Sequence, residues 1–251
     1  PVKYVLEDQI QTSYADRNTG ARNARGEALA FCDADQIAAE RWLTNLLSHW
    51  HERDKYAGFC GPCPPKPVKS KPLMSRYWAE QNLGVTNLGP EDTQVDRWFT
   101  GNLCVRADRF WELAGFDPHC PSGGDGQFTR RLSRRSGSPL LYVGAAVQHH
   151  RIRLSCGSIV RQRFRIAYGA ARKEAGDTGG VGARLVRQLA GTVWFWVRIP
   201  PLSARELIFR GEGDWRYTSF ELLLGSVVKT SELAGYFAYH FRMPEKIVAR
   251  F

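Results

Sequence analysis

Two aspartates one residue apart form the first candidate site in this sequence. Asp33 and Asp35 directly follow residues 28–32, an apolar run with the length of a buried strand. Ligands of open α/β sheets bind beyond the carboxyl ends of the strands, so a site is expected here. Alternate residues of an extended segment point the same way, so both carboxylates suit one Mg2+ or Mn2+ ion and its phosphates. The alternative is a solvated turn in which an aspartate caps the next helix.

Another acid and a pair of histidines extend this set. Asp125 stands in a Ser-Gly-Gly-Asp-Gly stretch before an arginine-rich segment. It either caps the following helix or acts as a general base that takes a proton from a hydroxyl nucleophile. His149 and His150 end a predicted strand and precede Arg151 and Arg153. This combination suits metal or phosphate contact, although a hydrogen-bonded structural histidine is the usual outcome.

Hydrophobic periodicity predicts the elements that must position these residues. Strands are expected at 1–6, 28–32 and 97–106, with a strand pair at 139–150. Helices are expected at 17–28, 39–53, 107–115, 128–135 and 158–174, and amphipathic helix is expected beyond residue 184. Residues 58–92 are rich in Pro, Gly, Lys and Asn, which indicates a long loop. The alternation of strands and helices predicts an α/β sheet.

Composition and charge limit the class of protein. The 251 residues are 43% hydrophobic and 24% charged, which excludes collagen-like, low-complexity and wholly disordered chains. The sequence contains no run of about 18 apolar residues, so it predicts no conventional membrane-spanning helix. Residues 1–129 carry 14 Lys and Arg against 17 Asp and Glu, whereas residues 130–251 carry 21 against 8. The basic C-terminal half indicates either an anionic partner, such as nucleic acid, an acidic membrane or a phosphorylated ligand, or a solvated basic face.

The six cysteines are too few for a disulfide scaffold in a chain of this length. Cys60 and Cys63 have the spacing of redox and zinc motifs. The prolines around them do not favour the helix that a redox site needs, and no second ligand pair completes a zinc site. An incidental pair of loop thiols is therefore the favoured interpretation.

Four segments, taken in order, resemble the family 2 nucleotide-sugar glycosyltransferases, which have the GT-A fold. They are RNTGARNARGEALAFCDAD at 17–35, FTGNLCVRADRFWELAGFD at 99–117, SGGDGQFTRRL at 122–132 and AAVQHHRIRLSCGSIVRQRFRIAYG at 145–169. The resemblance covers about residues 1–170. It implies a partial GT-A domain over 1–170, with a nucleotide-sugar-binding mixed sheet flanked by helices. The amphipathic pattern of the remaining residues predicts a helical C-terminal region over 171–251.

The resemblance also implies roles for individual residues. Asp33 and Asp35 match the DxD motif that binds the nucleotide sugar through a divalent metal, Mg2+ or Mn2+, with Asp35 as the direct ligand. Asp125 matches the catalytic base. His149 matches the histidine often found near the metal and diphosphate, and His150 is the less favoured of the two.

Further positions match the family more loosely. Arg17 and Asn18 lie in a segment that helps to shape the nucleotide pocket. Other residues are expected near the diphosphate, namely Arg161, Arg163 and Arg165, or near the donor sugar or acceptor, namely Trp98, Thr100, Gly101 and Asn102.

Two departures from the family pattern stand out. Gly124 occupies a position where many members have Glu, so only the second acid of that pair remains. The family's initial apolar strand, its P-x-[YH]-N turn and a second strand have no counterpart here. Together they would span about 60 residues, at about 30 per βαβ unit. We therefore expect a fragment that lacks half of its nucleotide pocket and is inactive alone.

The implied reaction transfers a hexosyl group, with inversion, from a nucleoside-diphosphate sugar to a hydroxyl of a glycan or lipid-linked acceptor. Arginines and tryptophans beyond residue 184 suit the headgroup boundary of an anionic bilayer, which predicts peripheral membrane contact at the cytoplasmic face. The alternative for that segment is helices that cover the sheet or another subunit. For the whole chain, the competing hypotheses are a non-catalytic fold and a basic nucleic-acid-binding module, although no nucleic-acid-binding signature is present.

Overall fold

The computed structural model describes residues 2–80, 93–120, 122–175, 189–190, 192–193 and 215–242. The chain divides into two compact units, Pro1–Ile152 and Arg153–Phe251. Residue 170, where the sequence places the end of the catalytic domain, lies within helix α6 (Cys156–Ala175). That functional boundary stays a prediction.

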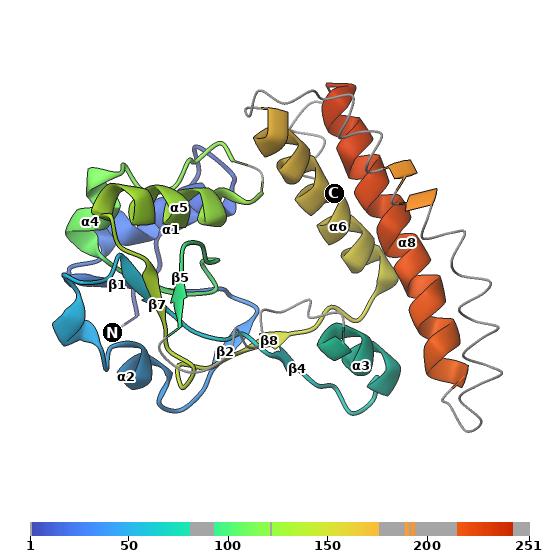
Figure 1. Ribbon diagram of the computed structural model, residues 1–251, viewed down its shortest axis with the longest axis horizontal. Coiled ribbons are helices and arrows are strands. Elements are labelled where there is room, and N and C mark those ends of the chain that lie inside the picture. Colours follow the sequence, from blue (N-terminus) through green and yellow to red (C-terminus); the bar gives the residue numbers. More distant parts are fainter. Residues whose placement is uncertain are drawn as a thin grey trace. The chain divides into compact units, whose positions relative to one another are not determined.

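The first unit is built around a mixed sheet of five strands (Figure 1). Their order across the sheet is β1 (Ala28–Cys32), β6 (Asn102–Arg106), β3 (Gly58–Cys60), β7 (Leu140–Tyr142) and β5 (Gln94–Val95). Strands β3 and β7 run parallel, and the other neighbours run antiparallel. The strand expected at 28–32 is confirmed, and the sheet is mixed as predicted.

A second, smaller sheet joins the acidic turn to the histidines. Its order is β2 (Gln36–Ala38), β8 (Gln148–Arg151) and β4 (Pro65–Lys66). Strand β2 begins directly after Asp35 and pairs antiparallel with β8, so that Gln36 lies opposite His150 and Ile37 lies opposite His149. This pairing brings residues more than 100 positions apart to one place.

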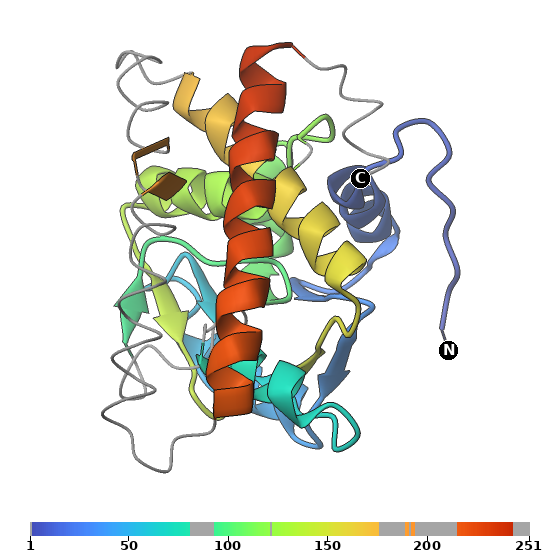
Figure 2. The same ribbon diagram turned by 90° about the vertical axis from the view of Figure 1, so that its right-hand side faces the viewer.

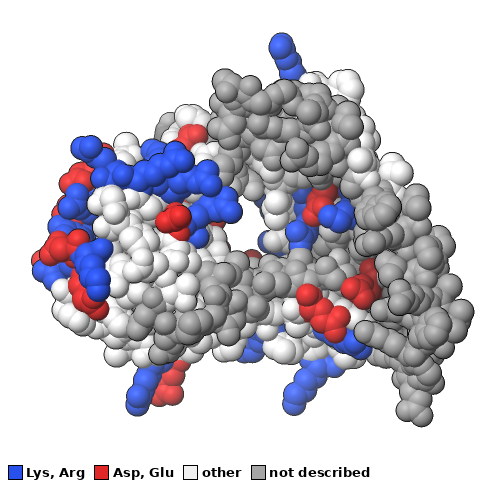
Figure 3. Space-filling view, viewed as in Figure 1, with Lys and Arg blue, Asp and Glu red and all other residues white. Residues whose placement is uncertain are grey.

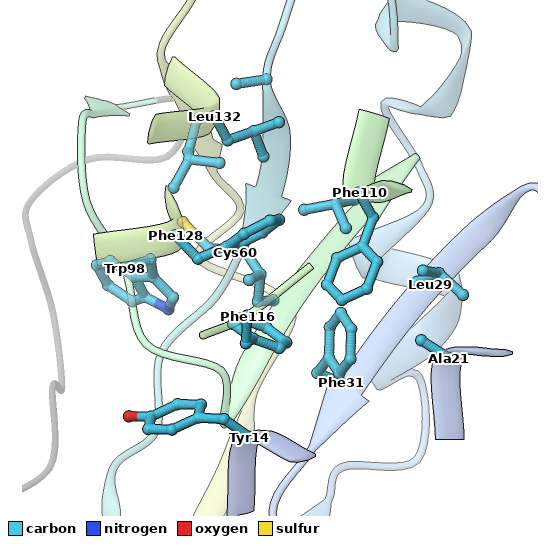
Figure 4. Close-up of a cluster of buried hydrophobic side chains, with 14 of the residues drawn as sticks. Tyr14, Ala21, Leu29, Phe31, Cys60, Trp98, Phe110, Phe116, Phe128 and Leu132 are labelled. Atoms are coloured by element: carbon cyan, nitrogen blue, oxygen red, sulfur yellow. The ribbon is translucent and has the colours of Figure 1, made fainter. Parts of the chain in front are cut away.

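Helices cover both faces of the larger sheet. One face carries α1 (Ser13–Asn23), α4 (Ala107–Glu112) and α5 (Gly124–Ser136), whose aromatic side chains form the main core (Figure 4). The other face carries α2 (Trp42–Leu46) and a 3-10 turn (Trp50–Glu52). The short helix α3 (Pro72–Glu80) follows β4.

Alternation along the strands assigns side chains to the two cores. In β6, Leu103 and Val105 enter the main core, whereas Cys104 enters the core under α2. In β7, Leu140 and Tyr142 face one way and Leu141 the other. Strands buried on both faces read as continuous apolar runs, as these do.

Helix α5 is strongly amphipathic. Phe128 and Leu132 are buried, while Arg130, Arg131, Arg134 and Arg135 are exposed. Figure 3 shows Lys and Arg gathered over this helix.

The described part of the second unit consists mainly of α6 and α8 (Trp215–His240), which lie side by side in both views (Figures 1 and 2). Arg163 of α6 contacts Glu232 of α8, and Tyr168 further along α6 contacts Tyr239 further along α8. The two helices therefore run parallel. A side chain at Gly235 would overlap the Phe164 carbonyl, with its Cβ 2.2 Å from the oxygen, so glycine permits this close approach. No helix among the described residues is long and apolar enough to cross a membrane.

Several expected elements were wrong. Residues 2–10 contain no strand, and Val2, Tyr4 and Leu6 are exposed. The helix expected at 39–53 is reduced to α2 and one 3-10 turn.

Other elements differ in their limits. The helix expected from residue 17 starts at Ser13, where Thr12 caps it by accepting the Ala15 N–H. The stretch 58–80, expected to be loop, holds β3, β4 and α3. The expected strand pair at 139–150 is divided between two sheets. The membrane prediction depends on the segment beyond residue 184, of which the structure describes only residues 189–190, 192–193 and 215–242.

Candidate functional site

The acidic turn joins the end of β1 to the start of β2. Gln36 holds this turn through two hydrogen bonds to Asp33. The backbone N–H of Gln36 donates to the Asp33 carbonyl over 3.0 Å, and the side-chain oxygen of Gln36 accepts from the backbone N–H of Asp33 over 3.3 Å. The Asp33 and Asp35 side chains are 29% and 41% exposed. Both carboxylates are therefore accessible on a fixed turn.

Arg17 faces this turn from α1. Its guanidinium donates to the Asp33 carboxylate and lies over the Tyr14 ring, 5.4 Å from the ring centroid. Tyr14 and Arg17 are three residues apart, so they share one face of the helix. This arrangement places a cation beside the first acid of the predicted donor site.

Asp125 is held at the start of α5. Its Oδ1 accepts the Gly126 N–H over 2.8 Å. Burial raises the pKa of Asp125, while hydrogen bonds from the Gly126 and Thr100 backbone and the Arg17 charge oppose that rise. The nearby Asp33 charge adds to it. Arg17 therefore acts electrostatically on both acids, which belong to one site.

His150, rather than the favoured His149, lies beside the acidic turn. Its Nε2 is 3.5 Å from Asp35 Oδ2, and its ring stacks on Trp78 with centroids 5.8 Å apart. Successive strand residues point to opposite faces, so His149 is directed away from the face that His150 shares with Gln36. The predicted metal role of His149 stays a prediction.

No cluster of three or more His, Cys, Asp or Glu side chains suited to a metal ion occurs among the described residues. The Asp35–His150 pair nevertheless offers one oxygen and one nitrogen donor, with the Asp35 side chain open to solvent. The Nδ1 atom of His150 is buried, and no hydrogen-bond partner meets it among the described residues. Two protein ligands fit a divalent ion whose remaining positions are filled by substrate oxygens and water.

Asn18 and Asn102 are buried, and each fixes a loop. The Asn18 side chain bonds to both the N–H and the carbonyl of Phe116, over 3.0 and 2.8 Å. Asn102 accepts from the Trp42 indole and donates to the Pro62 and Ala146 carbonyls. The contacts predicted for these asparagines with nucleotide, sugar or acceptor stay predictions.

Gly101 lies directly against the acidic turn. A Cβ there would stand 2.3 Å from Gln36 Nε2 and 3.1 Å from Asp33 Oδ2. The close approach therefore requires glycine. Thr100 and Trp98 are also buried, and no hydrogen-bond partner meets the Trp98 indole N–H among the described residues.

Cys63 contacts Gln36, which holds the acidic turn, and Cys60 packs in the main core. Both thiols are free and buried, and Gln36 Nε2 donates to Cys63 Sγ over 3.3 Å. Burial raises the pKa of both thiols, so they stay protonated and poorly nucleophilic. These observations favour the structural interpretation of the pair.

The arginines predicted to face the diphosphate belong to the second unit. Arg163 Nη1 lies 3.6 Å from Glu232 Oε1, and both side chains are largely buried. Burial lowers the pKa of Arg165, and the charges of Arg153 and Arg161 lower it further. These three arginines form a cationic group, with Arg161 and Arg165 on α6 and Arg153 in the segment before it. Their contact with a diphosphate stays a prediction.

Sequence reasoning missed three residues that contact the predicted site. Tyr14 contacts Asp125, Gln36 holds the acidic turn, and Trp78 stacks on His150. The spacing of Tyr14 and Arg17 was the only available signal, because the other two contacts depend on the pairing of strands distant in sequence.

Comparison with known proteins gives consistent results. Residues 1–111 match the family described as glycosyl transferase family 2. Glycosyltransferase AglE of Haloferax volcanii is 28% identical over 170 residues, which are 67% of this chain and 53% of that protein. This chain thus spans about half the length of that curated relative.

A solved structure resembles this one over most of the chain. Mannosyltransferase PcManGT from Pyrobaculum calidifontis, in complex with GDP-Man and Mn2+, superposes with a TM-score of 0.56 at 13% identity. The match covers 96% of this chain and 70% of the mannosyltransferase. It confirms the expected GT-A fold. Residues 1–111 and the curated relative thus make this chain similar to members of glycosyl transferase family 2.

Proposed function

We propose that this chain contributes the donor and base sites of an inverting hexosyltransferase that uses a nucleoside-diphosphate sugar. The observation that carries the proposal is the arrangement around Arg17, which binds Asp33 and also influences the Asp125 carboxylate. It joins an acid at the end of a strand, where α/β proteins bind ligands, to a half-buried acid suited to proton transfer.

Asp125 is the proposed general base. It removes the proton of the acceptor hydroxyl as the hydroxyl oxygen attacks the anomeric carbon. The bond from that carbon to the diphosphate breaks, and the nucleoside diphosphate leaves with the electron pair. Attack on the face opposite the leaving group inverts the anomeric centre in one displacement, without a covalent enzyme intermediate.

Asp35 and His150 are the proposed protein ligands of a divalent ion, with Asp33 beside them. A bound divalent ion would offset charge on the departing diphosphate. The fold relative solved with GDP-Man and Mn2+ supports Mn2+ as the first ion to test. Arg17 orients Asp33, and Gly101 allows the Gln36 side chain to lie close against the turn.

Donor binding tests this proposal. UDP-glucose, UDP-GlcNAc and GDP-mannose should each be titrated by calorimetry, with and without Mn2+, into this chain and into the full-length gene product. We expect one donor to bind only when Mn2+ is present. The substitution Asp35→Ala should abolish this Mn2+-dependent binding. Mn2+-dependent binding unchanged in Asp35→Ala would contradict the assignment.

We also propose a lipid-linked acceptor, with peripheral contact at the cytoplasmic face of a membrane. A groove of about 540 Å³ between α6 and α8 is lined by Val160, Phe164, Val227 and Ala234, together with hydroxyl residues of α8. Those hydroxyls bond to carbonyls one turn earlier in their own helix, so the groove is apolar.

Cations lie next to this groove. Arg161 and Arg165 each follow a groove residue of α6 by one position, which is 100° around the helix. Arg163 lies on the opposite side of Phe164 and is paired with Glu232. An apolar groove beside two arginines suits a hydrocarbon chain that carries a phosphate.

Vesicle sedimentation tests the lipid proposal. The chain should sediment with phosphatidylglycerol vesicles at low salt and not with phosphatidylcholine vesicles. The double variant Arg161→Gln/Arg165→Gln should lose this binding. The variant Arg134→Gln/Arg135→Gln on α5 removes equal charge and serves as the matched control. Equal losses in both variants would mean that net charge, not this surface, binds the membrane.

A further inference from the structure

Tyr14 reaches from α1 to the start of α5. Its hydroxyl oxygen accepts the Gly124 N–H over 2.9 Å and lies 3.5 Å from Asp125 Oδ1. The phenol hydroxyl of Tyr14 can accept hydrogen bonds and has one proton to donate. The bond from the Gly124 N–H uses the oxygen only as an acceptor. The proton is therefore available to the Asp125 carboxylate.

The Tyr14 ring fills the space that a side chain at position 124 would need. An added Cβ at Gly124 would lie 2.9 Å from Cε2 and 3.0 Å from Cζ of Tyr14. The ring is 6% exposed and packs against Phe116, with centroids 5.8 Å apart. The absence of a side chain at Gly124 therefore lets the Tyr14 ring pack there, and this packing brings the Tyr14 hydroxyl to Asp125.

The charged groups around this contact come from three elements. Arg17 lies over the ring from α1, Asp33 follows β1, and Asp125 belongs to α5, with the Cys120 thiol nearby. Burial raises the pKa of Tyr14 well above its usual value, and the Asp125 charge raises it further. The hydroxyl consequently stays protonated wherever Asp125 is ionised.

We propose that Tyr14 is a positioning residue for the base: its hydroxyl fixes the orientation of the Asp125 carboxylate and favours the ionised form. This inference rests on the proposed function of Asp125. Because donation to a carboxylate favours its charged form, loss of the hydroxyl should raise the pKa of Asp125. The base would then be protonated over a wider range of pH.

Tyr14→Phe isolates the hydroxyl, because the ring and its packing remain. In the full-length gene product, release of nucleoside diphosphate from the donor identified by the calorimetric panel should show kcat reduced about tenfold. The donor KM should be unchanged, and the acidic limb of the pH–rate profile should move to higher pH. Tyr56→Phe is the matched control, since Tyr56 packs against the core on the other face of the sheet.

A second measurement needs no activity. In this chain, the carboxyl ¹³C resonance of Asp125, assigned by its loss in Asp125→Asn, should titrate at higher pH in Tyr14→Phe than in the wild type. An unchanged titration together with an unchanged kcat would overturn the inference. A loss of melting temperature with equal effects on kcat and KM would also overturn it, because it would mark a purely structural role. Retained activity in Asp125→Asn would instead refute the proposed function itself.

Discussion

At Asp125, burial and neighbouring charge act on one carboxylate in opposite directions. Burial disfavours the charged form, whereas the Gly126 N–H and the Arg17 guanidinium favour it. The first effect raises the proton affinity that a base requires, and the second keeps the group available in the ionised form. A general base works best when its pKa lies near the operating pH, so the opposed effects suit this role.

Asp125→Asn should therefore lower turnover by about 10²- to 10⁴-fold, the usual contribution of a general base. Donor binding should be retained, because the amide keeps the shape and can still accept the Gly126 N–H. Single-turnover kinetics in the full-length gene product, with donor affinity measured by calorimetry, would separate the two effects. Equal losses of affinity and rate would point to a binding role for Asp125.

The same substitution should affect stability in a pH-dependent way. Because the folded-state pKa of Asp125 is raised, the folded protein binds that proton more tightly than the unfolded chain does. Ionisation above the folded-state pKa therefore weakens folding, and this loss disappears as the pH falls towards the ordinary value of an aspartate. Denaturant unfolding should find Asp125→Asn at least as stable as the wild type at pH 7.5. Its advantage should shrink by pH 4, and an advantage that grew on acidification would contradict the assigned direction.

The two adjacent histidines provide a matched pair of variants. His150 faces Asp35, and His149 points to the other face of β8. We expect His150→Ala to weaken Mn2+ binding at least tenfold, the lower end of the effect of disturbing a metal site. His149→Ala should change it little. Electron paramagnetic resonance of free Mn2+ would measure both affinities, and a larger effect of His149→Ala would identify His149 as the ligand instead.

At the scale of elements, the site depends on pairings that no local pattern reveals. The apolar run before Asp33 correctly predicted β1, and the glycine-rich stretch correctly placed Asp125 near the start of a helix. The choice between His149 and His150 was not accessible from sequence, because it depends on the register between β2 and β8. Tyr14 was missed because its partner is more than 100 residues away.

The central strands illustrate the same limit. Residues 58–60 lie in a segment whose prolines and glycines indicated a loop, yet β3 is wholly buried between β6 and β7. A strand of three residues is too short to give a periodic signal. Tertiary pairing, rather than local preference, determines its conformation.

Asn102 should prove important for stability because it joins helix α2 to two loops. Asn102→Ala leaves the Trp42 indole N–H and the Pro62 and Ala146 carbonyls without this partner. Loss of a buried partner costs about 1–3 kcal/mol, and we expect a loss of at least that size in denaturant unfolding. The control is Asn45→Ala, which removes one exposed bond to the Ala145 carbonyl. Equal effects of the two variants would show that burial of Asn102 is unimportant.

At the scale of the whole molecule, the two units differ in how they are stabilised. The two cores of the first unit consist of residues before position 147, from sheets and helices alike. The described part of the second unit consists mainly of the α6–α8 pair, joined by close packing at Gly235. Most of the excess positive charge belongs to residues 130–251.

This division predicts that residues 1–152 fold without the remainder. A truncated chain should give a dispersed amide NMR spectrum and one cooperative unfolding transition, because its core residues are all retained. The Asp35–His150 pair should keep its Mn2+ affinity in that chain. Collapse of spectral dispersion would show that the first unit requires the second for folding.

The stack of Trp78 on His150 has a practical consequence. Trp78 is 1% exposed and lies nearly parallel to the imidazole, with an interplanar angle of 24°. The fluorescence of the Trp78 indole responds to a paramagnetic ion or a new charge that contacts the neighbouring His150 imidazole. Mn2+ bound between Asp35 and His150 would quench Trp78, whereas Mg2+ at the same place would shift its emission with little quenching. Trp78 is thus an intrinsic fluorescence probe that can distinguish Mn2+ from Mg2+ at this site. The variant Trp78→Phe is the control.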